Sequence, residues 1–277
     1  MKNFLFLFFF ITNFFYGQSK VNLPSGVNFT PENFTKIEYG KNKYNVFYDV
    51  SFSPDSKFPE KKSELKYLLQ INGKVSKFMD PNRLGQDSLA YEYKDKKQLT
   101  NIELNKFLQT NVRSHKVVLK NNADNKLIVQ NRHGKRYQYE ETLPEINWLI
   151  HNEEKVILGN RCKKATAHFR GRSFVAWFAN DITISDGPDV FYGLPGLILE
   201  INDEQNHFHY KAVEIIKDET QIYLMDYYST LKVSRSQFRD LQKNYFNNAG
   251  FYHTSAFNSD GSRIASSPIP YNPIELE

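Results

Sequence analysis

The sequence of 277 residues contains a single cysteine, Cys162, so it cannot form an internal disulfide. The basic side chains of Arg161, Lys163 and Lys164 would favour a thiolate if the thiol were exposed. A cysteine nucleophile would also need a histidine partner, which no spacing in the sequence supplies. We therefore expect Cys162 to be a buried, small apolar side chain in a strand.

The motifs of common enzyme classes are missing as well. The sequence contains no Gly-x-Ser-x-Gly turn, no His-Glu-x-x-His helix, no phosphate-binding loop and no dinucleotide-binding fingerprint. Asp181, Asp186 and Asp189, together with Glu200, could supply a pair of catalytic carboxylates. Aspartates in turns more simply bond the local backbone, and this is the interpretation that we prefer for Asp181 and for Asp186 before Gly187.

A metal site has weak support in the sequence. In a strand, His207 and His209 would point to the same face and form a two-point clasp for a metal ion. No third ligand lies at a matching spacing, so we expect surface histidines beside a turn at Asn202-Asp203. The sequence accordingly predicts no metal ion and no cofactor.

Long apolar runs are confined to the N-terminus. Met1-Lys2-Asn3 precedes an apolar segment, residues 4–11, that is too short to cross a bilayer as a helix of ~20 residues. This pattern predicts a signal peptide over residues 1–17 with cleavage near Gly17-Gln18. The mature chain would then be periplasmic or secreted and would have no transmembrane segment.

The excess of positive charge is small. The formal net charge is +5, and it falls to +4 without residues 1–17, which carry one lysine and no acid. Charges of both signs alternate in stretches such as residues 94–97, as on a solvated surface. We therefore expect no nucleic-acid partner.

Aromatic residues are abundant, with 17 tyrosines and 23 phenylalanines, and such side chains pack well on half-buried sheets. Asn72-Gly73 between two apolar runs is a strong hairpin signal. Helical periodicity is scarce. A helix is possible over residues 101–109, and residues 234–247 form a well-marked one with Ser234 and Gln237 as a capping box.

These patterns predict a mainly β protein with a large curved antiparallel sheet, half-barrel or sandwich-like, and one helix near the C-terminus. We expect a single domain over residues 18–257. Residues 258–277 are rich in Ser, Pro and Asn, and this composition predicts a mobile tail.

Residues 187–201 combine turn signals with an apolar run. Pro195-Gly196 fits the central positions of a type II turn, in which the glycine takes a positive φ. In a strand after this turn, Leu197, Leu199 and Ile201 would face the core and Glu200 would face the opposite side.

The same segment carries a resemblance to a known family. The family's hexapeptide is spelled by Gly193, Leu194, Pro195, Gly196, Leu197 and Ile198, and similar accompanying positions are Cys162, Ala165, Gly171, Arg172, Ala176, Trp177, Gly187 and Pro188. In these residues the chain resembles the GLPGLI family of Bacteroidota envelope proteins, whose function is uncharacterised and which supplies no catalytic residue. The resemblance implies that Arg172 and Trp177 are structural partners, with ligand binding as the alternative. Glu200 joins them as a candidate if its side of the strand lines a groove.

The sequence leaves two functions open. The first is a non-enzymatic envelope protein that binds an apolar or peptide-like ligand, or an outer-membrane partner, on the concave side of its sheet. The second is a periplasmic hydrolase that acts on peptides through carboxylates or histidines brought together by folding. Because catalytic motifs are missing, we favour the binding protein. An aromatic open groove would support binding, whereas convergent titratable groups in a buried site would support catalysis.

Overall fold

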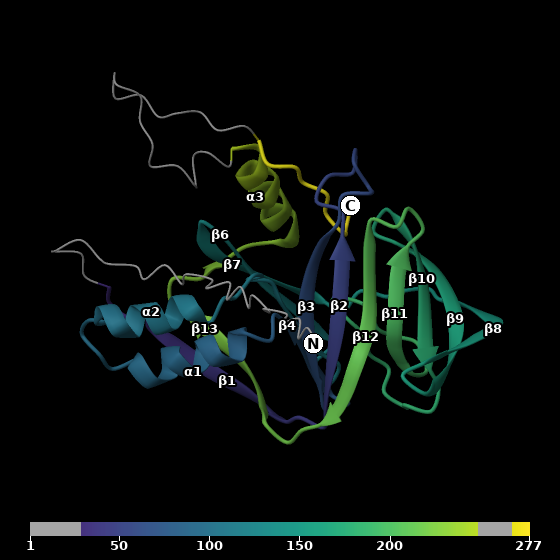
Figure 1. Cartoon of the computed structure of the whole chain (residues 1–277), viewed down its shortest axis with the longest axis horizontal. Helices are drawn as coiled ribbons and strands as arrows, with labels where there is room; N and C mark the ends of the chain where they lie inside the picture. The colour runs from purple at the N-terminus through teal and green to yellow at the C-terminus, as the bar shows by residue number, and fades with distance from the viewer. Residues whose placement is uncertain (1–28, 249–267) are drawn as a thin grey trace, which may run out of the picture.

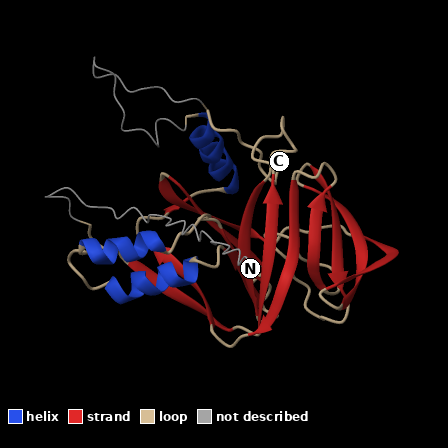
Figure 2. Cartoon of the chain, viewed as in Figure 1, coloured by secondary structure: helices blue, strands red, loops and turns tan. Residues whose placement is uncertain are grey.

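The computed structural model describes residues 29–248 and 268–277 (Figure 1). The predicted signal peptide and its cleavage site lie outside the described residues. Strands dominate the described part of the chain, and three helices accompany them (Figure 2). The prediction of a mainly β fold with a helix near the C-terminus is therefore confirmed.

Twelve strands form one large sheet that is not closed into a barrel. Their order is β14-β7-β6-β5-β4-β3-β2-β12-β11-β10-β9-β8, and all neighbours are antiparallel except β14 and β7. The strands are β2 (Tyr44–Phe52), β3 (Ser63–Ile71), β4 (Val75–Met79), β5 (Val117–Asn121), β6 (Lys126–His133), β7 (Lys135–Thr142), β8 (Leu149–Ile157), β9 (Asn160–Phe169), β10 (Arg172–Ala179), β11 (Leu197–Asp203), β12 (Phe208–Lys217) and β14 (Leu231–Lys232). A separate antiparallel pair is formed by β1 (Phe34–Lys41) and β13 (Gln221–Tyr227).

Local signals predict two of the three helices and the central hairpin. α2 (Asn101–Gln109) covers the expected residues, and α3 (Arg235–Asn247) follows Ser234, whose hydroxyl accepts a hydrogen bond from a backbone N–H as a capping box requires. β3 and β4 form the hairpin around Asn72-Gly73, with Gly73 at a φ of +89°. All three predictions are confirmed.

α1 (Arg83–Tyr93) is the helix that the sequence does not reveal. Its buried face carries the charged Arg83 and Asp87 beside Ala90, so the apolar period of an amphipathic helix is weak. α1 and α2 pack on the β1–β13 pair through a small cluster that includes Ala90 and Met225. This layer covers one side of the large sheet.

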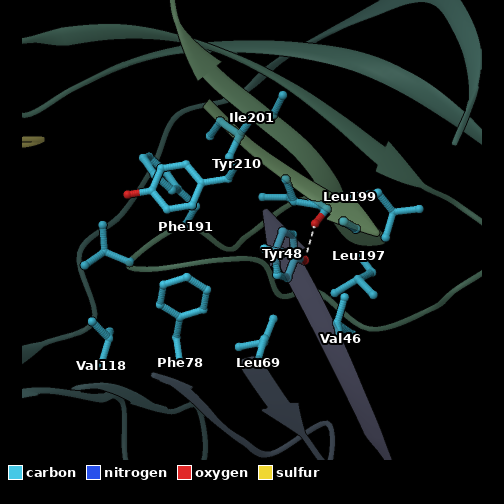
Figure 3. Close-up of a cluster of buried hydrophobic side chains, with 14 of the residues drawn as sticks. Val46, Tyr48, Leu69, Phe78, Val118, Phe191, Leu197, Leu199, Ile201 and Tyr210 are labelled. Carbon is cyan, nitrogen blue, oxygen red and sulfur yellow. Dashed lines mark hydrogen bonds between the residues drawn. The ribbon is translucent and has the colours of Figure 1, made fainter. Parts of the chain in front are cut away.

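The central strands are buried on both faces. On one face, a large core cluster joins residues from β2 to β11 and includes Tyr48, Phe78 and Phe191 (Figure 3). On the other face, Leu119 and its neighbours pack against the β1–β13 pair. Tyr48 is fully buried, and its hydroxyl donates a hydrogen bond to the carbonyl oxygen of Ile198 at 2.6 Å, so burial leaves this group satisfied.

The segment before β11 enters the large core. Lys120 on β5 is fully buried and donates from Nζ to the carbonyl oxygens of Gly187 at 2.6 Å and Phe191 at 3.0 Å. Its Nζ also lies 2.6 Å from a carboxylate oxygen of Asp186. The Lys120 ammonium group thus has both an opposite charge and hydrogen-bond acceptors inside the core. A buried ion pair is tolerated only where its groups are satisfied in this way.

The three aspartates of this region have different surroundings. Asp181 is exposed. Asp186 bonds the backbone N–H of Gly187, as expected of a turn residue, but it also pairs with Lys120, and Asp189 is buried against Lys116. The interpretation of Asp186 as a turn residue is therefore incomplete, because its carboxylate also anchors the segment to β5, and Asp189 anchors the segment to the residue that precedes this strand.

Gly196 corrects the prediction of a type II turn. Positive φ is found at Gly193, at +95°, and Gly196 is not among the glycines with positive φ. The reason for glycine at 196 is close approach, since a Cβ there would lie 2.2 Å from the carbonyl oxygen of Ala179. Leu197 and Leu199 are buried after it as predicted, but Ile198 is buried as well, because a register shift between β10 and β11 interrupts the expected alternation.

Residues 268–277, part of the predicted mobile tail, lie against the sheet and α3 (Figure 1). The backbone N–H of Leu276 donates to the carbonyl oxygen of Arg170 at 2.8 Å. The Glu275 carboxylate lies 2.8 Å from the Arg170 guanidinium and 2.5 Å from that of Arg235. Composition does not reveal these partners, because Arg170 and Glu275 are 105 residues apart in sequence.

Candidate functional site

A cavity of about 470 Å³ lies between the core face of the sheet and α3. We call it the groove. Side chains of β2, β3, β6 and β12 form one wall, and α3 together with residues 269–275 forms the other. Its volume falls within the roughly 300–1,000 Å³ that is typical of small-molecule sites.

The groove walls are largely aromatic and aliphatic. The aromatic lining includes Phe52, Tyr67, Tyr139, Phe208, Phe246 and Tyr271. Phe52 stacks on Phe208 with ring centroids 6.4 Å apart, and Phe246 stacks on Tyr271 at 4.7 Å. Such faces contribute apolar area to a ligand while their own packing holds them in place.

Polar groups deep in the groove are already satisfied by the protein. The Tyr67 hydroxyl donates to Ser114 Oγ at 2.7 Å, and the Tyr210 hydroxyl donates to Asp189 Oδ2 at 3.1 Å. Lys116 Nζ lies 2.6 Å from the same Asp189 carboxylate. Burial raises the pKa of both tyrosine hydroxyls, so these groups stay neutral. They present no activated nucleophile or base to a ligand.

One part of the groove is basic. Arg113 and Arg132 both contribute to its lining and are exposed, and the Arg132 side chain shares the face of Gln130 in β6, which is turned toward β13. His115 contributes to the lining as well, and its Nδ1 is buried without a hydrogen-bond partner among the residues that the structure describes. Burial, reinforced by the positive charges of Arg83 and Arg132, lowers the pKa of His115 to about 4. The imidazole is therefore neutral at neutral pH.

Arg172 supports the groove from behind its wall. It is buried on the core side of β10 and donates to Asp203 Oδ2 at 3.1 Å, to Asn272 Oδ1 at 2.6 Å and to the carbonyl oxygen of Pro273 at 2.8 Å. Asn272 and Pro273 line the groove, whereas Arg172 does not. Its guanidinium therefore positions the C-terminal segment.

Trp177 and Glu200 lie on the other face of the sheet. Trp177 follows Arg172 by an odd number of residues in β10, so the two side chains point to opposite faces and the expected pairing is not formed. Lys155 lies over the Trp177 ring at 4.4 Å and donates to Glu200 Oε2 at 2.7 Å. Hydrogen bonds from His209 and Lys155 lower the pKa of Glu200 to about 2.

The two histidines of the possible metal clasp are separated as well. His207 precedes β12, outside the alternation of the strand, and its Nδ1 lies 3.2 Å from Arg172 Nη1. His209 Nε2 lies 3.1 Å from Glu200 Oε1 on the opposite face. The predicted common face is therefore wrong. Within residues 29–248 and 268–277, no group of three or more His, Cys, Asp and Glu side chains could hold a metal ion.

Cys162 is buried in β9, as predicted. Its thiol donates to the carbonyl oxygen of Asn160 at 3.5 Å. Burial raises the pKa of the Cys162 thiol to about 11, which disfavours the thiolate at neutral pH.

The groove residues carry no signal in the sequence. Arg113 and Arg132 are ordinary basic residues among many, and only the fold shows that both contribute to one cavity lining. Val50, Phe238 and Ile274 meet in the same cavity from segments far apart along the chain. Motif spacing cannot report such an arrangement.

Comparison with known proteins gives a short family match. Residues 170–200 match the family described as "Protein of unknown function (Porph_ging)". This match includes β10 and the segment that leads to β11. Among curated proteins, no sequence matches the chain significantly. None of the described helices is long and apolar enough to span a membrane.

Among solved structures, the chain is similar to two crystal forms of PNGF-II. The identities are 14% and 15%, and the TM-scores are 0.49 and 0.48. Each match covers 74% of this chain but only 34% or 33% of the PNGF-II chain, so the protein spans about a third of the length of these structures. This similarity is too low to support a conclusion about function.

Proposed function

We propose that the protein is an exported, non-enzymatic envelope protein that binds an apolar or peptide-like ligand in the groove. The observation that carries this proposal is the cavity of about 470 Å³ with aromatic walls. Apolar walls with a few polar groups are the usual features of a ligand site. An outer-membrane partner that presents an apolar segment would use the same surface.

We also infer that the chain is a member of the GLPGLI family and is periplasmic or secreted. The hexapeptide Gly193 to Ile198 lies within the matched residues 170–200 and supports the first inference. The pattern of residues 1–17 supports the second. N-terminal sequencing of the exported protein tests it, and a mature chain that begins at Met1 would remove the argument for export.

The alternative is a periplasmic hydrolase that acts on peptides. Its best support is a row of side chains on the outer face, where Ser51 is opposite His209 in the strand register and His209 contacts Glu200. This order resembles a serine triad. In the described part of the chain, however, Ser51 and His209 are not hydrogen-bonded, and the cavity lies on the other face. We therefore favour binding.

Titration with the neutral apolar fluorophore Nile red tests the binding proposal. We expect saturable binding by the wild type and affinity reduced about tenfold by Phe246→Ala, which removes a half-buried ring from the groove wall. Trp177→Phe on the outer face is the matched control and should leave the affinity unchanged. Binding that is insensitive to Phe246→Ala but lost in the control would place the ligand on the outer face.

A further inference from the structure

The C-terminal segment, residues 268–277, lies on the rest of the chain as a bound peptide would. It forms neither helix nor strand, and residues 271–275 are half-buried while those on either side are exposed. Backbone hydrogen bonds attach it near its two ends, through the N–H groups of Ile269 and Leu276. Between these two points, side chains of the folded domain supply the contacts.

The middle of the segment is contacted by one buried guanidinium group. Arg172 donates to Oδ1 of Asn272 at 2.6 Å and to the carbonyl oxygen of Pro273 at 2.8 Å. The side-chain amide of Asn272 donates in turn to the carbonyl oxygen of Ser53 at 2.8 Å. Ile274 follows and packs against the large core cluster. A polar and an apolar side chain of the segment thus each have a complementary place.

The acidic end of the segment meets three further arginines. The carboxylate of Glu275 accepts hydrogen bonds from Arg170 at 2.8 Å and from Arg235 at 2.5 Å. Arg239 donates to the carbonyl oxygen of Glu275 at 3.0 Å and to that of Glu277. Hydrogen bonds between a guanidinium and a carboxylate are about twice as strong as those between neutral groups, so Glu275 contributes charge as well as shape.

The folded domain itself holds three of these arginines in place. Arg170 bonds Glu141 at 2.7 Å, and Arg172 bonds Asp203 at 3.1 Å. Arg235 lies 3.9 Å from Glu141. These contacts do not involve the segment, so the arginines are ordered in advance of its binding. A preorganised surface loses little conformational freedom when it binds a peptide.

The charges of this surface balance only when the segment is bound. We call it the docking surface, and its charged side chains are Arg170, Arg172, Arg235, Arg239, Glu141 and Asp203. Four positive charges face two negative ones, and the segment brings two more acids, Glu275 and Glu277. The docking surface is therefore complementary to an acidic peptide in charge as well as in its hydrogen bonds.

We propose that the docking surface recognises an extended acidic segment of a partner protein with the pattern Asn-Pro-x-Glu, where x is aliphatic, and that residues 272–275 occupy the surface in the free protein. The inference goes beyond the proposed function, because Arg170, Arg172 and Arg235 do not line the groove. The chain's own segment has the advantage of its tether, which gives it a high effective concentration. A partner segment must therefore bind more tightly than residues 272–275 do, or meet a weakened one.

Fluorescence anisotropy tests this proposal with the full chain and a labelled peptide that has the sequence of residues 268–277. The double variant Asn272→Ala/Glu275→Gln weakens the chain's own segment and leaves the docking surface intact. We expect this variant to bind the peptide saturably and the wild type to bind it at least about tenfold more weakly, because its own segment competes.

Two matched comparisons test the chemistry of recognition. The peptide with Glu275→Gln should bind the double variant at least about tenfold more weakly than the parent peptide. In the protein, Arg235→Gln added to the double variant should cause a similar loss. Arg161→Gln, which changes an exposed arginine outside the docking surface, is the control and should leave the affinity unchanged. Unchanged circular dichroism establishes that the variants are folded.

Three results would overturn the proposal. Failure of the double variant to bind the peptide would show that the segment docks only as part of its own chain. Equal binding of the parent and Glu275→Gln peptides would remove the role of the arginines. Wild-type dimers in sedimentation velocity that the peptide dissociates would make a second copy, and not a partner protein, the occupant. Nile red binding by the wild type is measured separately, so failure of the groove is distinguished from failure of the docking surface.

Discussion

The backbone at Gly196 lies so close to the backbone at Ala179 that there is no room for a side chain at position 196. The Cβ of an alanine would lie 2.2 Å from the Ala179 carbonyl oxygen and 3.2 Å from the Phe178 ring, so β10 and β11 would have to separate. The glycine of the hexapeptide is thus explained by packing, and this reason is stronger than the turn geometry that the sequence suggests.

Gly196→Ala should therefore lower the free energy of unfolding by about 2 kcal/mol or more, as overpacked core positions do. Gly85→Ala is the matched control, because no atom lies within 4 Å of its Cβ position in α1 and its φ is ordinary. The control should be neutral or slightly stabilising. Urea midpoints of both variants give the measurement, and equal midpoints would contradict the close approach.

Glu200 has a different role from a solvated surface acid. Glu200→Gln should destabilise the chain by about 1 kcal/mol near neutral pH, since it removes a partly exposed pair with Lys155 and His209. The folded pKa of about 2 lies below the ordinary value of 4.5, so this contribution is present above pH 4.5 and is lost as the pH falls toward 2. Thermal melts over this range should show the two proteins converging. A difference that persists at the acidic end would contradict the assignment.

At the scale of elements, what the sequence reveals depends on whether the signal is local. The Asn72-Gly73 turn and the Ser234 cap are local, and both are found as predicted. α1 is missed because Arg83 and Asp87 occupy its buried face. Two other features join segments that are far apart in the chain, so no local pattern predicts them. They are the pairing of β1 with β13 and the docking of residues 268–277.

The C-terminal segment is the element on which the groove wall depends. Although burial opposes the charged form, the positive charges of Arg170, Lys116 and Arg235 hold the pKa of Glu275 below its ordinary value. The stability that this carboxylate contributes is thus present above its ordinary pKa and is lost as the pH falls through the lowered value. The segment should loosen in acid.

Glu275→Gln tests this element at neutral pH. Hydrogen exchange should become faster at Leu276, whose N–H bonds the Arg170 carbonyl oxygen, because the ion pairs that hold the segment are lost. Glu154→Gln removes an exposed pair with Arg161 and should leave that exchange unchanged. Equal protection of residues 268–277 in the wild type and in Glu275→Gln would show that the ion pairs do not hold the segment.

At the scale of the whole molecule, the sheet has two faces with different chemistry. One face carries the large core and the groove, whose walls are largely aromatic and aliphatic. The opposite face of β10 to β12 carries the paired Trp177 and Glu200 group. The alternation of the strands predicts that two such faces exist. It does not predict which of them is hollow, because the cavity arises where α3 and the C-terminal segment close over the sheet.

The most direct test of the central claim asks which face binds an apolar ligand. Methyl resonances of a selectively labelled protein can be recorded during titration with dodecanol. The binding account predicts shifts at Val50, Leu65 and Ile274, which line the groove, and none at Val175, which lies on the face of Trp177. Shifts confined to Val175 and its neighbours, with the groove methyls unchanged, would contradict the account.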